Sequence, residues 1–506
     1  MTTSSSNSGL STILSSLGNS SSSYTTGYTS TSGTLISAGQ IDVTTLVSEL
    51  MTVQSQPLVR LQQQQSGIQT KLSAYGKEQS ALASLQTAAS ALALPSAFKA
   101  SSATVTGSGV SATVSGTPAS ATYSVAVNNL AQSQSVASAA VASPTATLGT
   151  GTLILQAGTY NATGNTFTAK SGANPITITI DSTNNTLNGI ASAINSAANG
   201  TVAASVVTDS SGSRLVLSSS NTGAANGFSL TASAGLSQFG FDPTAAAGTQ
   251  TMTQTQSAMD ASFTVNGLAL TSASNSVTSA INGLTLNLTQ GPATGGAALQ
   301  SQITVASDPT AITKTVNDFV SAYNSMITLT GSLTSYNAAS NTSSVLTGDF
   351  TSREVVSTLQ SIMGSQSQAN GAGSPYSYLV QVGISANSDG TLTLDSTKFQ
   401  AALAADPASV SALFTTATGA SNQQGFAVQV ENSVQNLISS TGVLGSIQQG
   451  LNSEVNSLTT QEAQLQAELA VTQQRLTQEY SQLNANLSAA QAQQVSLANS
   501  LAALPG

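Results

Sequence analysis

The chain has 506 residues, too many for a single core, and at about 150 residues per domain roughly three domains are expected. Only 6% of the residues are charged, so the surface must be mostly uncharged and polar, which suits packing against further copies of the chain. The formal net charge is −9, and the ten Lys and Arg residues gather in no stripe, which argues against nucleic acid as a partner. The absence of Cys and His excludes disulfides, thiolate metal sites and imidazole catalysis.

The N-terminal tail, residues 1–40, is rich in Ser and Thr and is predicted to be disordered, because it can bury little apolar area. It has neither a positively charged start nor a long apolar run, so no cleaved signal peptide is expected. No stretch of the chain is apolar for long enough to predict a membrane-spanning helix. If the chain is extracellular, it must be exported without a cleaved signal peptide.

The segment from Ile41 to Leu94 has the spacing of a long amphipathic helix. Asp42 and Thr44 or Thr45 can cap its start, and Pro57 is expected to divide it into a short helix and a long one. Apolar residues recur in it every seven positions, at Leu61, Ile68, Tyr75, Leu82 and Ala89. Residues 41–100 and 306–478 are predicted to form one helical stalk domain.

Residues 101–305 consist mainly of short alternating runs, which predict strands of antiparallel sheet. Residues 187–198 are the one helical segment here, with Ile194 on its apolar face. Two β-rich modules are expected, an inner one at 101–145 plus 236–305 and an outer one at 146–235. Tight turns are predicted at Asn188-Gly189, Asn199-Gly200, Asn226-Gly227, Asn266-Gly267 and Asn282-Gly283.

A second helical pattern begins near residue 308 and includes Tyr323, followed by Asn324. This pair could contact a partner, but the tyrosine lies on the apolar stripe, which favours a place in the helix core. A small hairpin is predicted at residues 383–395, beginning at Gly383 and turning at Asp389-Gly390.

The C-terminal segment repeats apolar residues in heptads, as a long helix or coiled-coil strand does. Its part from Leu451 to Leu476 is expected to pair with the N-terminal helix. Residues 479–506 extend past that partner and are predicted to be mobile before assembly. The candidate assembly contacts are Tyr480, Leu483, Leu487, Leu497 and Leu501.

The predicted fold class is therefore α+β and multidomain. Two long apolar-striped helices at opposite ends of the sequence can bury both stripes by pairing antiparallel. This pairing would form a stalk that carries the two inserted antiparallel β-rich modules as a head.

Short sequence blocks are spread in a fixed order along nearly the whole chain from about Ser37. They include residues 36–88, LTGDF at 346–350, VGISANSDGTLTLD at 382–395 and DPASVSALF at 406–414. Further members are Ala38-Gly39, Ile41-Asp42-Val43, Gln56-Pro57-Leu58, Ile194-Asn195, Val265-Asn266-Gly267, Ser274-Asn275 and Tyr323-Asn324. These blocks resemble the flagellar hook-associated protein 2 family. The long Ser/Thr tract and Gln40, where the family often has Leu, depart from its pattern.

The resemblance implies a non-enzymatic cap at the distal tip of the bacterial flagellar filament. Such a cap is a homo-oligomeric ring, commonly of about five subunits, beneath which exported flagellin folds and is inserted. Flagellin, the hook–filament junction proteins and a flagellar type III export chaperone are the implied partners, and no cofactor is implied. The implied location is extracellular, at the flagellum tip.

Three other classes of function are alternatives to a filament cap. The 19 Asp and Glu residues are scattered and form no hydrolase, phosphate-binding or calcium-binding motif, so catalysis is disfavoured. A surface adhesin that binds host or surface glycans through Ser/Thr-rich β modules is the main alternative. A flagellin or junction paralogue fits the Ile194-Asn195 motif but not the terminal blocks.

Overall fold

The computed structural model describes residues 36–37, 40–246, 249–371 and 374–502, and most of the predicted disordered tail lies outside these ranges. The chain divides into two compact units, Met1–Gly76 with Leu444–Gly506, and Lys77–Val443. Among the helices that the structure describes, none is long and apolar enough to cross a membrane.

The first unit contains α2 (Val43–Gln54), the N-terminal half of α3 (Gln56–Ala93) and nearly all of α10 (Val443–Ala502), preceded by the paired strands β1 (Ile36–Ser37) and β2 (Gln40–Ile41). The break between α2 and α3 falls directly before Pro57, which confirms the predicted division. The helix begins at Val43 rather than at Ile41, because Asp42 caps it.

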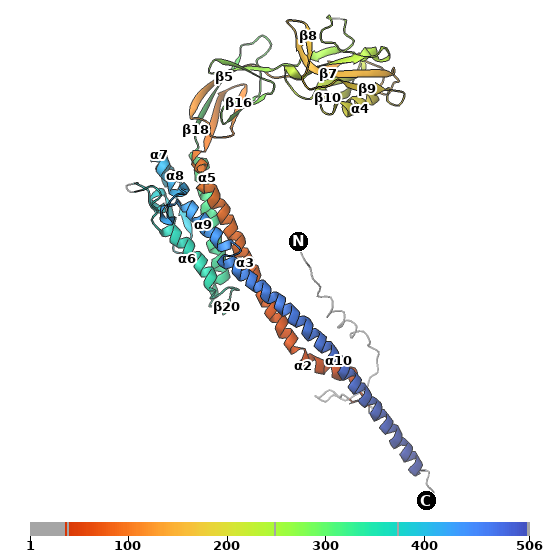
Figure 1. Cartoon of the computed structure of the whole chain (residues 1–506), viewed down its shortest axis with the longest axis vertical. Coiled ribbons are helices and arrows are strands. Elements are labelled where there is room, and N and C mark those ends of the chain that lie inside the picture. Colours follow the sequence, from red (N-terminus) through yellow and green to blue (C-terminus); the bar gives the residue numbers. More distant parts are fainter. Residues whose placement is uncertain (1–35, 38–39, 247–248, 372–373, 503–506) are drawn as a thin grey trace. The chain divides into compact units, whose positions relative to one another are not determined.

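The helices α3 and α10 lie side by side and run antiparallel (Figure 1). Gln62 Nε2 donates to Glu462 Oε1 at 2.8 Å, and Gln65 Nε2 donates to Thr459 Oγ1 at 2.8 Å. Along the seam, Leu58, Ile68 and Leu458 are buried. Glu462, which interrupts the heptads in the sequence, is thus used as a hydrogen-bond acceptor between the two helices.

In the second unit, one hydrophobic core lies between two antiparallel sheets, with the strand orders β15-β14-β5-β18-β3 and β16-β17-β4. Alternation along the strands places Val125, Val127, Phe263 and Ile303 in this core. The strands are β3 (Ser101–Gly107), β4 (Val110–Val114), β5 (Ala121–Asn129), β14 (Ala261–Val265), β15 (Leu268–Ser272), β16 (Ser276–Ile281), β17 (Leu284–Leu288) and β18 (Leu299–Ser307).

A separate core packs α4 (Leu187–Ala198) against two further antiparallel sheets. The sheet orders are β10-β11-β6-β13 and β12-β7-β8, with β9 also paired to β7. Ile190, Ile194 and Phe228 are buried in this core. The strands are β6 (Ser135–Ala137), β7 (Gly151–Asn161), β8 (Thr166–Ala169), β9 (Ile176–Ile180), β10 (Val202–Asp209), β11 (Gly212–Ser219), β12 (Gly227–Ala232) and β13 (Thr253–Gln256).

Three of the five predicted Asn-Gly turns are confirmed by positive φ angles at Gly200, Gly267 and Gly283. The prediction at Asn188-Gly189 is wrong. This pair lies in the first turn of α4, where the Thr186 hydroxyl accepts the Gly189 N–H. The prediction at Asn226-Gly227 is also wrong, because Gly227 has φ −69° and begins β12.

The rest of the second unit is helical. Its helices are the C-terminal half of α3, α5 (Pro309–Thr334), α6 (Phe350–Gly364), α7 (Ser396–Ala405), α8 (Pro407–Thr415) and α9 (Phe426–Ile438). Short strand pairs join them, β19 (Tyr336–Asn337) with β20 (Thr342–Ser343), and β21 (Ile384–Ala386) with β22 (Leu392–Leu394). The fold is thus a mixture of helix and antiparallel sheet that ends in a long C-terminal helix, as the sequence predicted.

Candidate functional site

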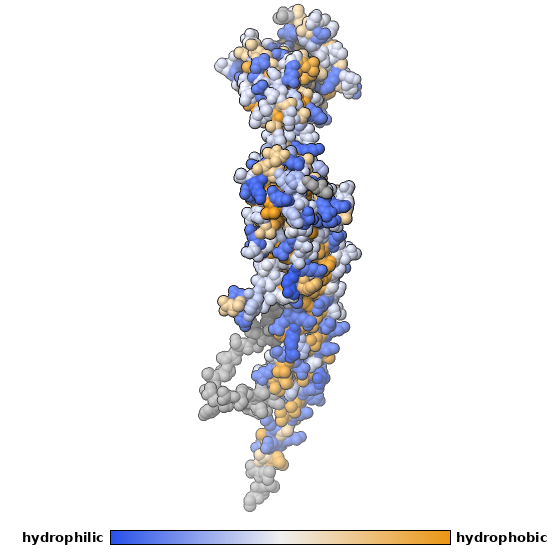
Figure 2. Space-filling view, turned by 90° about the vertical axis from the view of Figure 1, so that its left-hand side faces the viewer, coloured by the Kyte–Doolittle hydropathy of each residue, from blue (hydrophilic) through white to orange (hydrophobic). Residues whose placement is uncertain are grey.

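The distal half of α10 carries apolar side chains that nothing in the described chain covers. Leu483 is 44% exposed, Leu487 37% and Leu497 62%, whereas Tyr480 is half-buried. Leu501 lies in the helix, but its side chain lies outside the described residues. No charged residue follows Glu479 in this helix. Hydrophobic residues recur among hydrophilic ones along the helical part of the surface in Figure 2.

The proximal half of α10 differs in burial. Leu444 is fully buried and Leu458 is 5% exposed. The exposed stripe therefore begins beyond the part that packs against other elements. Val495 is also 60% exposed, but it lies on a different face of α10 from Leu483 and Leu497. An exposed apolar stripe on a helix is a surface suited to a helical or grooved partner.

The Ile194-Asn195 motif stabilises the fold locally. Ile194 is 1% exposed, within the core around α4. Asn195 Nδ2 donates to the Ala204 carbonyl at 2.8 Å, and the Ala204 N–H donates to Asn195 Oδ1 at 2.7 Å. One side-chain amide thereby satisfies both backbone groups of a residue in β10, as a neighbouring strand would. The motif fixes α4 to the edge of its sheet.

The Tyr323-Asn324 pair acts in the same way between α5 and β22. Asn324 Nδ2 donates to the Leu392 carbonyl at 2.7 Å, and the Leu392 N–H donates to Asn324 Oδ1 at 2.7 Å. Tyr323 is 1% exposed, and its hydroxyl donates to the Gly390 carbonyl at 3.2 Å. Burial raises the pKa of Tyr323 to about 12. The expectation of a helix-core tyrosine is confirmed.

Two further side-chain amides make the same two-bond clamp. Gln134 Nε2 donates to the Phe228 carbonyl at 3.0 Å and its Oε1 accepts the Phe228 N–H at 2.8 Å. Asn275 Nδ2 donates to the Ala131 carbonyl at 2.9 Å and its Oδ1 accepts the Ala131 N–H at 2.7 Å. Sequence reasoning missed the role of Gln134, because its partner lies 94 residues away and no local pattern marks it.

The glycines of the predicted motifs occupy positions where the backbone needs them. Gly383 has φ +87°, and a Cβ there would lie 2.8 Å from the Asp395 carbonyl oxygen. Gly390 has φ +82°, and Asp389 Oδ1 accepts the Thr391 N–H at 2.9 Å. Asn266, at φ +50°, accepts the Ser124 N–H at 2.9 Å. These residues shape turns, as expected for Asp389-Gly390.

The aspartates are used as structural acceptors, which disfavours a catalytic role for them. Every aspartate except Asp318 accepts a backbone N–H, and Asp318 pairs with Lys314 at 2.6 Å. The helix caps among them are Asp42, Asp308, Asp349, Asp395 and Asp406. The Thr45 hydroxyl and amide hold the pKa of Asp42 below its usual range. Within the described residues, no three acidic side chains gather as a metal site would require.

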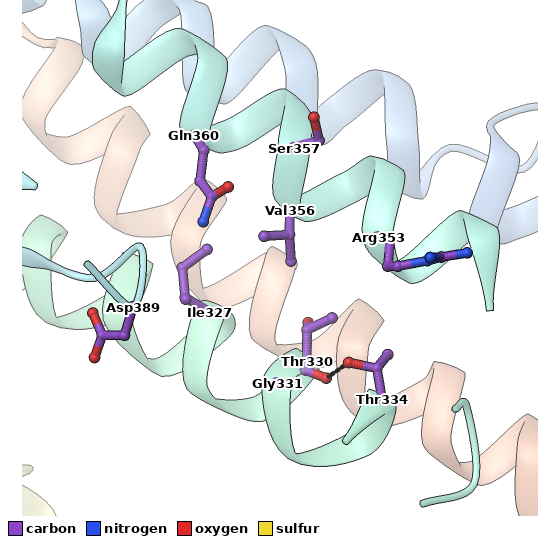
Figure 3. A pocket seen from close by; sticks show the side chains of 9 residues that line it. All are labelled: Ile327, Thr330, Gly331, Thr334, Arg353, Val356, Ser357, Gln360 and Asp389. Atoms are coloured by element: carbon purple, nitrogen blue, oxygen red, sulfur yellow. Dashed lines mark hydrogen bonds between the residues drawn. The ribbon is translucent and has the colours of Figure 1, made fainter. Parts of the chain in front are cut away.

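A shallow cavity of about 200 Å³ lies between α5, α6 and the β21–β22 turn (Figure 3). Ile327 and Val356 provide apolar lining, with Asp389 and Arg353 apart from each other along it. The Arg353 guanidinium donates to the carbonyls of Asp349 and Gly348 at 3.1 and 3.3 Å. The cavity therefore presents no arrangement of acid, base and nucleophile.

Comparisons with known proteins agree with this absence of catalytic geometry. The family model "Flagellar hook-associated protein 2 N-terminus" matches residues 39–134, and the model "Flagellar hook-associated protein 2 C-terminus" matches residues 258–492. The B-type flagellar hook-associated protein 2 of Pseudomonas aeruginosa is 30% identical over 492 residues, covering 94% of this chain and 98% of the relative. The chain belongs to the flagellar hook-associated protein 2 family. This finding confirms the resemblance seen in the sequence.

Further members of the family match over most of the chain. The flagellar hook-associated protein 2 of Escherichia coli K12 is 31% identical over 429 residues, 83% of this chain and 87% of the relative. The crystal structure of the D1-D2-D3 domains of the flagellar cap protein FliD from Escherichia coli superposes with a TM-score of 0.56 at 31% identity. The superposition covers 75% of this chain and 99% of the chain in that crystal structure.

The hook-associated protein 2 family consists of structural filament-cap proteins, so this chain is not an enzyme. The comparisons do not support the adhesin alternative. In a cap protein, the candidate functional surfaces are those that meet other subunits, and the distal stripe of α10 is the one that both the heptad spacing and the exposed fractions indicate.

Proposed function

We propose that this chain caps the distal tip of the flagellar filament as a ring of identical subunits, commonly about five, and assists the folding and insertion of exported flagellin. The observation that supports this role most is the match to hook-associated protein 2 over 98% of the Pseudomonas aeruginosa relative. The weakly charged surface suits lateral contacts between copies, since little charge repulsion keeps the copies apart.

The architecture proposed for this role is a stalk that carries two head modules. The antiparallel pair of α3 and α10, with the helices at 306–478, would form the stalk. Residues 101–145 with 236–305 would form the inner head module, and residues 146–235 the outer one. Two separate hydrophobic cores support a division of the head into two modules. The core around α4 also contains Val136, Leu236 and Phe241, so the outer module takes in residues from beyond both ends of the range predicted for it.

Residues 479–506 are proposed to be mobile before assembly and to pack against flagellin or the hook–filament junction proteins afterwards. Beyond Glu479 this helix has no charged residue, and its exposed leucines are unfavourably hydrated until a partner covers them. The same stripe is a suitable contact for a flagellar type III export chaperone. Export without a cleaved signal peptide to the filament tip completes the proposal.

The double substitution Leu483→Gln with Leu487→Gln tests the role of this stripe. Both side chains are more than a third exposed, so we expect little change in the stability of the isolated chain. Filament growth should fall strongly, because the partner would lose its apolar contact. Filament length in electron micrographs of a complemented deletion strain is the measurement.

The matched control is Ala485→Gln with Ala489→Gln. Both alanines are exposed on the same two turns of α10 but on the opposite face, so this variant should support normal filaments. Normal filament length with the leucine variant, or equal loss with both variants, would reject the stripe as an assembly contact.

A further inference from the structure

Glu78 of α3 is a buried carboxyl group that its surroundings satisfy only in part. Its side chain is fully buried, in a chain where charged residues are rare. The Ser352 Oγ of α6 donates to Glu78 Oε2 at 2.9 Å. Within the described structure, Glu78 Oε1 has no hydrogen-bond partner. Burying an ionised group without full compensation is costly, so an ionised Glu78 destabilises the packing of the helices around it.

Within the part of the chain that the structure describes, Glu78 forms no ion pair. From α5, Thr330 contributes a hydroxyl, and from the start of α6 Asp349 contributes a second negative charge. Arg353 lies close in sequence, but its guanidinium donates to the carbonyls of Asp349 and Gly348.

The other titratable residues near Glu78 in the sequence of α3 and α6 do not supply a counter-charge. Lys77 and Glu354 are exposed, and Tyr75 is a buried, uncharged phenol one turn earlier in α3. Ionised Glu78 therefore lies among neutral donors and a like charge.

We propose that Glu78 is a proton-controlled switch for the packing of α3 against α5 and α6. When Glu78 is ionised, an uncompensated charge and an unpaired oxygen lie between the three helices. When it is protonated, the charge is gone and the packing tightens. This switch would act within the folded chain alone and does not depend on the proposed function.

The direction of the pH dependence follows from the surroundings. Burial raises the pKa of Glu78 above its ordinary value of 4.5, although the Ser352 and Thr330 hydroxyls lower it in part. The folded state thus binds the proton more tightly than the unfolded state. Stability from protonated Glu78 is fully present below the ordinary pKa and is lost as the pH rises through the pKa of the folded state.

Hydrogen exchange of the α6 amides in the full-length protein tests this switch. The readout is the protection factor between about pH 4.5 and 7.5, which corrects for the pH dependence of the intrinsic exchange rate. In the natural chain, protection should fall with rising pH, by about tenfold for each unit by which the folded pKa is raised. Glu78→Gln should remove that fall and leave α6 better protected at neutral pH.

Two further variants make the result specific. Glu354→Gln removes an exposed carboxylate from the same helix and should leave the pH dependence as in the natural chain. Ser352→Ala keeps Glu78 but removes its hydrogen-bond donor, so the pKa of Glu78 in the folded state should rise further. The fall in protection should then continue to higher pH than in the natural chain. Parallel pH profiles for the natural chain and Glu78→Gln, or an unchanged profile in Ser352→Ala, would overturn the proposal.

Discussion

Gln134→Glu is expected to lower the free energy of unfolding of the β module around Phe228 by about 3 kcal/mol or more. Gln134 is 4% exposed, and its amide satisfies both the N–H and the carbonyl of Phe228. A glutamate keeps the acceptor but loses the donor. It would place a buried negative charge against the Phe228 carbonyl oxygen.

Urea unfolding of the full-length protein, followed by the β-sheet circular dichroism signal, measures this effect. The matched control is Gln254→Glu in β13, the strand beside Gln134's neighbour β6, because Gln254 is exposed and its substitution should change stability by less than about 0.5 kcal/mol. Equal stability of the two variants would show that the two-bond clamp contributes little to the fold.

Truncation after Leu476 is expected to abolish filament capping while the β cores and the helices around α5 stay folded. The cut removes the exposed leucines of α10 but leaves Leu444 and Leu458, which are buried in the proximal half. The contacts of Gln62 with Glu462 and of Gln65 with Thr459 also survive. The truncation should therefore impair assembly of the filament but not folding of the chain.

Complementation of a deletion strain and circular dichroism of the purified truncated chain measure the two effects separately. The expected outcome is a near-natural spectrum in the shortened chain together with no filaments in the complemented cells. A truncated chain that still supports filament growth would show that the distal part of α10 is not needed for capping.

The periodic elements could be predicted from the sequence because their signals are local. The helix predicted at residues 187–198 has the same bounds as α4, since Leu187, Ile190 and Ile194 recur on one face and Thr186 caps it. The two long helices predicted from heptads near the ends of the chain, and the division before Pro57, are confirmed for the same reason. The capping role of Asp42 follows from the preference of helix starts for short acceptors.

The helices between residues 350 and 438 were not predicted as separate elements. They are short, and Asp406 both ends α7 and caps α8, so no long period is visible in the sequence. Their packing depends on residues that are distant in the sequence. The ring of Phe414, for example, stacks on that of Phe98 with 5.6 Å between the ring centroids. Local periodicity carries no information about such pairs.

Most of the motif residues of the candidate site make contacts within the fold, and these contacts could be foreseen only in part. Tyr323 was expected in the core because of its place on the stripe. The two-bond clamps of Asn195 and Gln134, and the burial of Glu78, join elements distant in the sequence. A lone polar residue has the same local appearance whether it is solvated or paired in the core, so these roles required the structure.

Deleting the gene, examining the cells by electron microscopy and assaying flagellin in the culture medium would show whether this chain caps the filament. If the chain is the cap, the cells should carry bare hooks and the medium should contain unpolymerised flagellin. Filaments of normal length and number on the deletion strain would contradict this role.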